Sequence, residues 1–407
     1  MERSVTVRRK DAMPWGDLVE KAKALKPILG KYAARRDAER EYPLDEMRLI
    51  VESGIPSARI ERSRGGPELS FVQLADVLVH VATADPNIAQ MLQPHLIICE
   101  WIRLEGSPEQ KSKFLGEAVK GAFFSNGFAE RGTKFVGETR TTLVRDGPNY
   151  RLSGTKFFST GSYFADYMLS NAIRDDGVFV LAVYPKSREG VRIADDWDGM
   201  GQRTTASGTT ELENVLIHPD EVIALPRFGK QRTLVGTAAQ LPHVAIDVGI
   251  ACAALSDAIA YCKTRARPIA GTGVQSASED PYVIYAVGEM NVMVHAAETM
   301  LRRGAEFLDT AARAQIDLRE GEVLEKELVE ASIAVAEAKV VATNACLQAT
   351  EMMYRVGGAS MALRTYNYDR HWRNARTHTL HDPVTYKYHA VGEFYLNGKN
   401  PMISMKL

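Results

Sequence analysis

The sequence predicts a mostly α-helical α+β protein with three parts: a helical domain over residues 1–120, an antiparallel, β-barrel-like domain over 121–228, and a four-helix-type bundle over 229–407. Three observations lead to this prediction. Apolar residues recur at helical spacing in the first and last parts, they alternate along the middle part, and turn residues separate the alternating runs. A chain of 407 residues is long enough to bury a core in each part.

The first part contains amphipathic helices. Steps of three or four residues separate the apolar positions of one such stripe, which consists of Leu18, Ala22, Leu25, Leu29 and Tyr32. Two further helix starts are marked by Asp85-Pro86 and Ser107-Pro108, where a capping side chain precedes a proline at the first helical position. At least four helices fit before residue 116.

The middle part has the pattern of β-hairpins. A turn at Asp146-Gly147-Pro148 separates two alternating runs, and Asp176-Gly177 separates a second pair. We therefore expect antiparallel strand pairs here.

The helical period returns after residue 233. One apolar stripe there is formed by Val287, Met290, Val294, Ala297 and Leu301. The alanine-rich stretch that begins at residue 327 predicts another long helix. Long helices with broad apolar faces usually pack as a bundle.

Composition excludes several classes of protein. Fifty basic and fifty-one acidic residues give a net charge of −1, so no global field attracts nucleic acid or an anionic membrane surface. The four cysteines are far apart and form no CxxC pair, which favours reduced core residues. The N-terminal residues are basic but lack an apolar stretch, and neither a signal peptide nor a membrane span is expected. These observations predict a cytoplasmic protein.

Histidine is concentrated near the C-terminus, where four of the nine histidines lie between residues 371 and 389. His378 and His381 are three residues apart, just before Asp382-Pro383. A metal site, a proton-transfer site and a hydrogen-bonded structural cluster all agree with this pattern. The metal interpretation lacks a third ligand at recognisable spacing, so no metal residue is assigned.

Other motifs are weaker. Ser159 and Thr160 follow two aromatic residues at the end of a predicted strand, where hydroxyl groups suit the edge of a planar ligand. The arginines of KTRARP at 263–268 fit either a phosphate clamp or a solvated surface, and the Gly357-Gly358 loop fits either a ligand contact or a helix end. Dinucleotide, P-loop and nucleophile-elbow motifs are absent.

The layout, together with GSPEQKSKFL at 106–115, MGQRTTASGTTELENVLIHPDEV at 200–222 and YDRHWRNARTHTLHDP at 368–383, resembles the acyl-CoA dehydrogenase superfamily along nearly the whole chain. In that family a glutamate after an RDAR segment removes the substrate α-proton. Here RNAR is followed by Leu380-His381-Asp382-Pro383, so His381 stands where the glutamate would be. The motifs THxLHDP and GTKxFxxG resemble the reduced-flavin monooxygenases of that superfamily, which include dibenzothiophene monooxygenase, sulfur-acquisition oxidoreductases and methanesulfinate monooxygenase.

This resemblance implies a role for each of a set of residues. The catalytic candidates are His381, His378 and Thr160. The FMN-binding candidates are Asn126, Phe128, Ala129, Ser159, Thr160, Arg267, Gly358 and Ser360, with Arg267 at the flavin phosphate and often supplied by a neighbouring subunit. The substrate-pocket candidates are Trp197 and His95.

The resemblance also implies a two-component reaction. A separate NAD(P)H-dependent flavin reductase supplies FMNH2, FAD being less expected, and a flavin 4a-hydroperoxide formed with O2 transfers one oxygen atom to the substrate. We expect a homo-oligomer, as a tetramer, that oxygenates sulfur in a small sulfinate, sulfide or sulfoxide. Aromatic thiophenes, oxygenation at nitrogen, a dehydrogenase with a relocated base and a flavin-binding protein without turnover remain alternatives.

Overall fold

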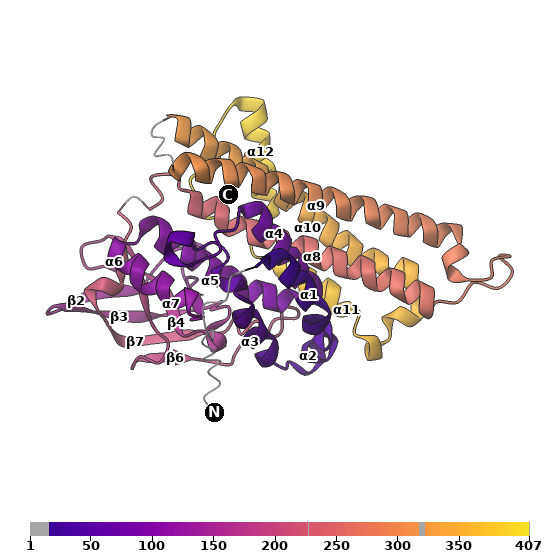
Figure 1. Cartoon of the computed structure of the whole chain (residues 1–407), viewed down its shortest axis with the longest axis horizontal. Helices are drawn as coiled ribbons and strands as arrows, with labels where there is room; N and C mark the ends of the chain where they lie inside the picture. Colours follow the sequence, from indigo (N-terminus) through magenta and orange to yellow (C-terminus); the bar gives the residue numbers. More distant parts are fainter. Residues whose placement is uncertain (1–15, 227, 317–321, 407) are drawn as a thin grey trace.

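The computed structural model describes residues 16–226, 228–316 and 322–406, and the basic N-terminal segment lies outside them. Figure 1 shows the N-terminal helices between a β-sheet and a set of long helices, which extend past the other two parts toward one end of the molecule. The predicted order of helices, sheet and helical bundle is confirmed.

The N-terminal part consists of helices that pack their apolar faces on the start of the bundle. Their bounds are α1 Leu18–Gly30, α2 Ala33–Glu39, α3 Leu44–Ser53, α4 Phe71–Ala84, α5 Pro86–Glu105, α6 Pro108–Gln110 and α7 Gly116–Val119. Both predicted helix starts are confirmed. The Asp85 side chain accepts a hydrogen bond from the Asn87 amide at the start of α5, and Ser107 and Gln110 form a reciprocal capping box at the start of α6.

The middle part is one eight-stranded sheet. Its strands are β1 Phe124–Gly127, β2 Thr142–Asp146, β3 Asn149–Lys156, β4 Tyr167–Arg174, β5 Phe179–Pro185, β6 Val191–Ile193, β7 Thr210–Ile217 and β8 Val222–Ala224. The predicted hairpins β2–β3 and β4–β5 are confirmed, with Gly147 and Gly177 at positive φ in their turns.

Most strand pairs are antiparallel, as predicted, but two pairs are parallel. Strand β4 pairs in parallel with both β1 and β2, so the sheet is mixed. Parallel neighbours need long connections, which here run over residues 128–166 from β1 to β4 and over residues 147–166 from β2 to β4. The strand order runs β6-β7-β3-β2-β4-β5-β8, and across the described residues no pairing joins β6 to β8. The sheet is therefore open rather than closed into a barrel.

The C-terminal part is a bundle built around α8. Its helices are α8 Leu234–Thr264, α9 Pro281–Ile316, α10 Glu322–Gly357, α11 Asp369–His378 and α12 Val384–Asn397. The predicted apolar stripe of α9 is buried except for Val287, which is partly buried. By length and composition α8 alone among the described helices is apolar enough to cross a membrane, yet 72% of its most apolar window is buried inside the protein. Burial of this extent is typical of a core helix.

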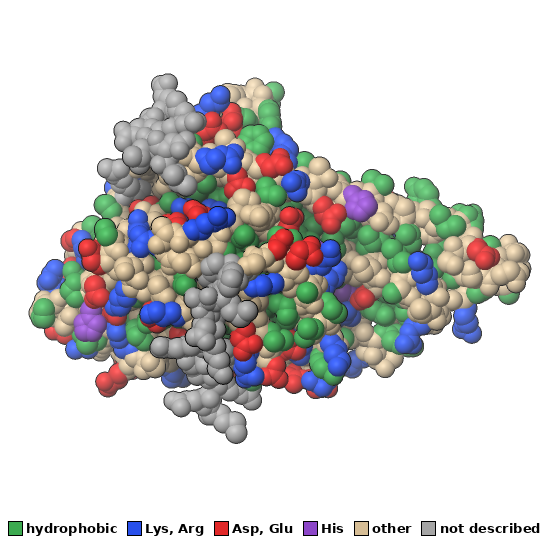
Figure 2. Space-filling model, viewed as in Figure 1, with side chains coloured by type: hydrophobic (Ala, Val, Ile, Leu, Met, Phe, Trp, Pro, Cys, Tyr) green, Lys and Arg blue, Asp and Glu red, His purple; other side chains and the backbone are tan. Residues whose placement is uncertain are grey.

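The surface has no dominant charge on the face drawn in Figure 2, where basic and acidic side chains are interspersed. Apolar side chains are nevertheless exposed on two helices of the bundle. They are Tyr282, Ile284, Tyr285 and Val292 on α9, and Tyr386, Tyr388, Tyr395 and Leu396 on α12. Large apolar side chains that gather on exposed helix faces often mark contacts between proteins.

Candidate functional site

The two predicted catalytic histidines lie where the end of α11 packs against α8. His378 is the last residue of α11, and its Nδ1 atom lies 2.6 Å from Oδ1 of Asp247 on α8. Its Nε2 atom lies 3.0 Å from Nδ1 of His243, one turn before Asp247 on the same helix. Positions four residues apart share one face of a helix, and α8 therefore presents both side chains to His378.

Asp247 also contacts cationic and hydroxyl groups of α10. Its Oδ2 atom accepts hydrogen bonds from Nζ of Lys339 at 2.7 Å and from the Thr343 hydroxyl at 3.1 Å. Burial opposes ionisation of Asp247, but Lys339 and His378 outweigh burial and hold the pKa of this carboxyl below its usual range. For His378 burial has the larger effect and lowers the pKa, although Asp247 partly offsets it. The resting pair is therefore a carboxylate beside a neutral imidazole.

A metal is not supported at this position. Both ring nitrogens of His378 are engaged by protein groups, which leaves no lone pair for a cation. Within the described part of the chain, no group of three or more His, Cys, Asp or Glu side chains is arranged to hold a metal ion.

His381 lies one turn beyond the end of α11 and is partly accessible. Its side chain is 44% exposed, and its ring stacks on that of His243 with 3.9 Å between centroids. Its Nδ1 atom lies 3.4 Å from the buried carboxyl of Asp382. Burial opposes ionisation of Asp382, but His381, Lys387 and Lys406 together hold its pKa well below the usual range. His381 thus forms the exposed end of a row of three imidazoles.

Thr160 belongs to a second cluster, built from hydroxyl groups. Its Oγ1 atom lies 2.8 Å from Oγ of Ser207, which lies 2.7 Å from Oγ1 of Thr205. Thr205 donates in turn to the Gln202 carbonyl at 2.9 Å. All three hydroxyl side chains are buried, and the chain of hydrogen bonds fixes the position of Thr160.

Backbone strain is concentrated around this hydroxyl cluster. Phe158, Gln202 and Ala206 have φ values of 55°, 52° and 49°, in the left-handed region that side chains other than glycine rarely adopt. The surrounding packing must hold such residues in place, and strain of this kind often lies at functional sites. The strained residues lie in the two segments that carry Thr160 and Ser207.

Residues 201–207 connect the hydroxyl cluster to the histidines. The amides of Gly201 and Gln202 donate to the Thr377 hydroxyl at 3.0 Å and to Oδ1 of Asn374 at 2.7 Å, both on α11. A Cβ atom on Gly201 would lie 2.0 Å from the Arg373 carbonyl, so only glycine allows this approach. Thr160 and the histidines are therefore held in a fixed relation.

Several buried polar atoms near the hydroxyl cluster and the histidines have no hydrogen-bond partner in the described part of the chain, and they indicate whether a flavin fits here. The Ser159 hydroxyl, Oδ1 of Asn126, both amide atoms of Gln202 and Nε2 of His243 have no hydrogen-bond partner among the described residues. Buried polar groups normally have partners, so a bound group with both donors and acceptors is implied. The polar edge of an isoalloxazine ring carries both kinds of group. The residues present therefore fit a flavin.

Aromatic residues lie next to these atoms. The rings of Phe157 and Phe158 lie 6.5 and 5.9 Å from that of Trp197, whose Nε1 donates to the Gln202 carbonyl. Ala129 pairs with Phe157 through a β-bridge, and the partly buried Phe128 precedes it. The predicted residues of the two flavin-edge segments and the pocket are thus brought together, with the exception of His95.

His95 has a structural role instead. It is fully buried, its Nε2 lies 3.0 Å from the Pro56 carbonyl, and the Phe124 amide donates to its Nδ1 at 3.0 Å. Both ring nitrogens are taken by the backbone, and none is left for a substrate. The structure therefore does not support the assignment of His95 to the substrate pocket.

The predicted phosphate-binding residues are not near the histidines of the same chain. Arg267 lies beyond the C-terminal end of α8, and the span from His243 to the end of that helix is roughly 30 Å at 1.5 Å per residue. Gly358 and Ser360 follow α10 and are exposed. One chain alone does not bring these residues to the site.

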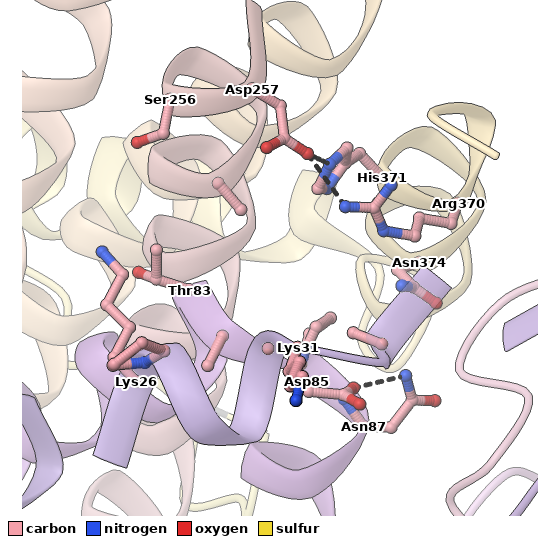
Figure 3. A pocket seen from close by; sticks show the side chains of 16 residues that line it. Lys26, Lys31, Thr83, Asp85, Asn87, Ser256, Asp257, Arg370, His371 and Asn374 are labelled. Atoms are coloured by element: carbon pink, nitrogen blue, oxygen red, sulfur yellow. Dashed lines mark hydrogen bonds and ion pairs between the residues drawn. The ribbon is translucent and has the colours of Figure 1, made fainter. Parts of the chain in front are cut away.

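A cavity of about 450 Å³ lies between α1, α5, α8 and α11, as Figure 3 shows. None of the catalytic, cofactor-binding or substrate-pocket residues predicted from the sequence lines this cavity. Its walls include Asn87 and Asn374, which accept hydrogen bonds from the amides of Thr204 and Gln202. The cavity thus lies behind residues 201–207, and its walls contribute two of the anchors of that segment.

Several residues of the site were not found from the sequence. They are His243, Asp247, Lys339 and Ser207. The spacing of His243 and Asp247 within an otherwise apolar helix was a usable signal, because buried ionisable side chains need partners. Lys339 and Ser207 carried no such local signal.

Comparison with known proteins identifies the family of the chain. The acyl-CoA dehydrogenase N-terminal, middle and C-terminal domains match residues 22–122, 129–215 and 241–385. The chain is 33% identical to dibenzothiophene monooxygenase of Mycolicibacterium goodii over 95% of both chains. It is 30% identical to the probable FMNH2-dependent monooxygenase SfnC of Pseudomonas putida, over 93% of this chain and 95% of that protein. The FMN-bound structure of TdsC from Paenibacillus sp. A11-2 superposes with a TM-score of 0.90 at 31% identity, covering 96% of this chain and 100% of that one.

Proposed function

Because the chain belongs to the acyl-CoA dehydrogenase family, within its flavin-dependent monooxygenases, we propose that it oxygenates the sulfur atom of a small organosulfur compound. The observation that carries this proposal is a row of three imidazoles, at the position where the family resemblance places a carboxylate base. His381, His243 and His378 occupy the end of α11 and the facing side of α8. Imidazole titrates near neutral pH and suits the transfer of protons to and from oxygen.

The cofactor is FMN. When bound in its reduced form it supplies the electrons that activate O2, so that one oxygen atom is added to sulfur and the other leaves as water. The sequence contains no GxGxxG motif of the dinucleotide-binding type. We therefore assign the reduction of FMN to a separate NAD(P)H-dependent reductase.

The protein groups have distinct roles in this proposal. His381, supported by His378, controls a proton close to the reacting oxygen. Thr160 holds the polar edge of the flavin through its hydroxyl, which Ser207 orients. Asn126 and Ser159 bind the same edge with their unpartnered buried atoms, while Trp197 and the adjacent phenylalanines cover the site.

A homo-oligomer completes the cofactor site. Arg267 is separated from His243 by roughly 30 Å along α8, so an Arg267 that binds the FMN phosphate must come from a neighbouring copy. Gly358 and Ser360 would be contributed in the same way. The exposed apolar side chains of α9 and α12 support contacts between copies, and we propose a tetramer. The four free cysteines agree with a reducing, cytoplasmic location.

Activity assays test the proposed function. The protein is mixed with a flavin reductase, NADH, FMN and O2, and sulfinates, sulfides, sulfoxides and dibenzothiophene are supplied in parallel. We expect an oxygenated product from a small sulfur compound at a higher rate than from dibenzothiophene. Turnover of amines but of no sulfur compound would show that the enzyme oxygenates nitrogen. Anaerobic reduction of bound oxidised flavin by an acyl-CoA would instead support the dehydrogenase alternative.

A further inference from the structure

A buried histidine that carries no assigned role, His243, lies at the centre of the imidazole row. Its Nδ1 contacts His378 at 3.0 Å, and its ring stacks against His381 at 3.9 Å between centroids. The side chain is buried, yet its Nε2 atom has no hydrogen-bond partner among the described residues. A buried imidazole nitrogen in this situation is aimed at a group that binds there.

The positions of the protons in this row follow from Asp247. Its carboxylate only accepts hydrogen bonds, so Nδ1 of His378 must carry a proton. In the neutral ring, Nε2 of His378 then carries a lone pair. This lone pair accepts a hydrogen bond from Nδ1–H of His243. The neutral His243 therefore has its own lone pair on Nε2. Asp247 thus dictates the tautomer of a ring that it does not touch.

The resting charges agree with this arrangement. Burial lowers the pKa of His243 well below its usual value, and the neighbouring His381, His378, Lys339 and Lys387 lower it further. His378 is also shifted downward by burial. Both rings are consequently neutral near neutral pH.

We propose that Nε2 of His243 is the proton acceptor of the active site and that Asp247 and His378 keep it in that state. As a bound reactant gives up a proton from an O–H bond, Nε2 of His243 forms an N–H bond, and the Nδ1 proton of His243 passes to Nε2 of His378. The positive charge comes to lie on His378, 2.6 Å from the Asp247 carboxylate. Returning the proton reverses both transfers, so none is consumed over a cycle.

This inference rests on the proposed function for its place in the reaction but not for its geometry. Within the row, His243 takes up the proton, His378 with Asp247 are positioning residues, and His381, stacked on His243 at the exposed side, keeps the role at the reacting oxygen proposed above. Burial disfavours a charge on His243 itself, and the transfer to His378 places that charge beside the Asp247 carboxylate.

Nitrogen NMR of histidine side chains in the flavin-free protein tests the tautomers directly. We expect His243 and His378 to be neutral and protonated at Nδ1 near neutral pH. In Asp247→Asn the new amide can donate to His378, and both rings should then carry their proton on Nε2. A His243 ring that is protonated at Nε2 in the wild-type protein, or that does not change in Asp247→Asn, would overturn the proposal.

Turnover gives a second readout. His243→Gln should lower product formation by about 10²–10⁴-fold at saturating FMN. His389→Gln, at an exposed position of α12, is the matched control and should retain wild-type rates. Wild-type turnover in a folded His243→Gln protein would contradict the inference. If the wild-type protein oxygenates no substrate, the proposed function fails, whereas the NMR result still decides the tautomers.

Discussion

The Asp247 carboxylate lies 2.6 Å from Nδ1 of His378, and neither side chain is accessible to solvent. The same carboxylate binds Lys339, so one buried anion neutralises a lysine of α10 and orients a histidine of α11. The arrangement therefore couples the stability of the bundle to the geometry of the site.

Loss of the Asp247 charge should destabilise the protein. In Asp247→Asn the buried Lys339 is left without a counter-ion, and we expect a loss of about 3–5 kcal/mol in the free energy of unfolding. The double variant Asp247→Asn, Lys339→Met removes both charges and should recover part of this loss without restoring activity. Urea unfolding of the wild type, Asp247→Asn, Lys339→Met and the double variant measures the coupling between the two side chains. Strictly additive effects would show that the ion pair does not contribute.

Removal of the exposed imidazole should affect activity without affecting the fold. His381 is 44% exposed, so His381→Ala should melt within about 2 °C of the wild type, as expected for a surface substitution. Product formation should fall by about 10²–10⁴-fold while oxygen consumption continues and releases hydrogen peroxide. The ratio of product to oxygen consumed is the quantity to measure. If this variant still forms one product molecule for each oxygen molecule consumed, His381 has no role in the mechanism.

Gly201 should not tolerate a side chain. A Cβ atom would lie 2.0 Å from the Arg373 carbonyl and 2.6 Å from the Asn374 amide, both backbone atoms of α11. We expect Gly201→Ala to cost about 1–3 kcal/mol and to weaken FMN binding, since residues 201–207 would move away from α11. Gly288→Ala on α9 is the control, because its Cβ meets nothing within 4 Å and alanine favours a helix. Equal melting temperatures for the two variants would contradict the close contact.

Acid should destabilise the protein through buried neutral histidines. Burial lowers the pKa of His95 from 6.5 to about 4, although the Pro56 carbonyl partly offsets this effect. The unfolded chain therefore takes up a proton before the folded one does, and stability falls as the pH decreases between these values. His95 alone contributes up to about 3 kcal/mol to this loss. Urea unfolding across this range should show a smaller slope for His95→Gln, and a wild-type stability that is flat or rises toward acid would refute the assignment.

Local features of the fold were predictable from the sequence. Asp85-Pro86 and Ser107-Pro108 marked helix starts because capping depends on neighbouring residues, and the glycine turns marked both hairpins. The parallel pairings of β4 were missed. Strand direction there depends on how long connections return to the sheet, which spacing along the chain does not reveal.

Site residues were predictable only where chemically distinctive residues lie close together in the sequence. His378 and His381 were found because histidine is rare and the two lie three residues apart. Asp247 and Lys339 meet through packing of α8 against α10, and His95 was misassigned because its backbone partners at Pro56 and Phe124 come from distant segments. Such contacts arise from tertiary structure alone.

Isotope labelling tests the central claim, sulfur oxygenation by this chain with reduced FMN, most directly. The protein, a flavin reductase and a small alkyl sulfide or sulfinate are incubated under oxygen-18 gas, and the product mass is compared with that from the His381→Ala variant. The account predicts one labelled oxygen atom in each product molecule made by the wild-type protein and a strongly reduced yield in the variant. Product oxygen that comes from water, or no oxygenated product from any sulfur compound, would contradict it.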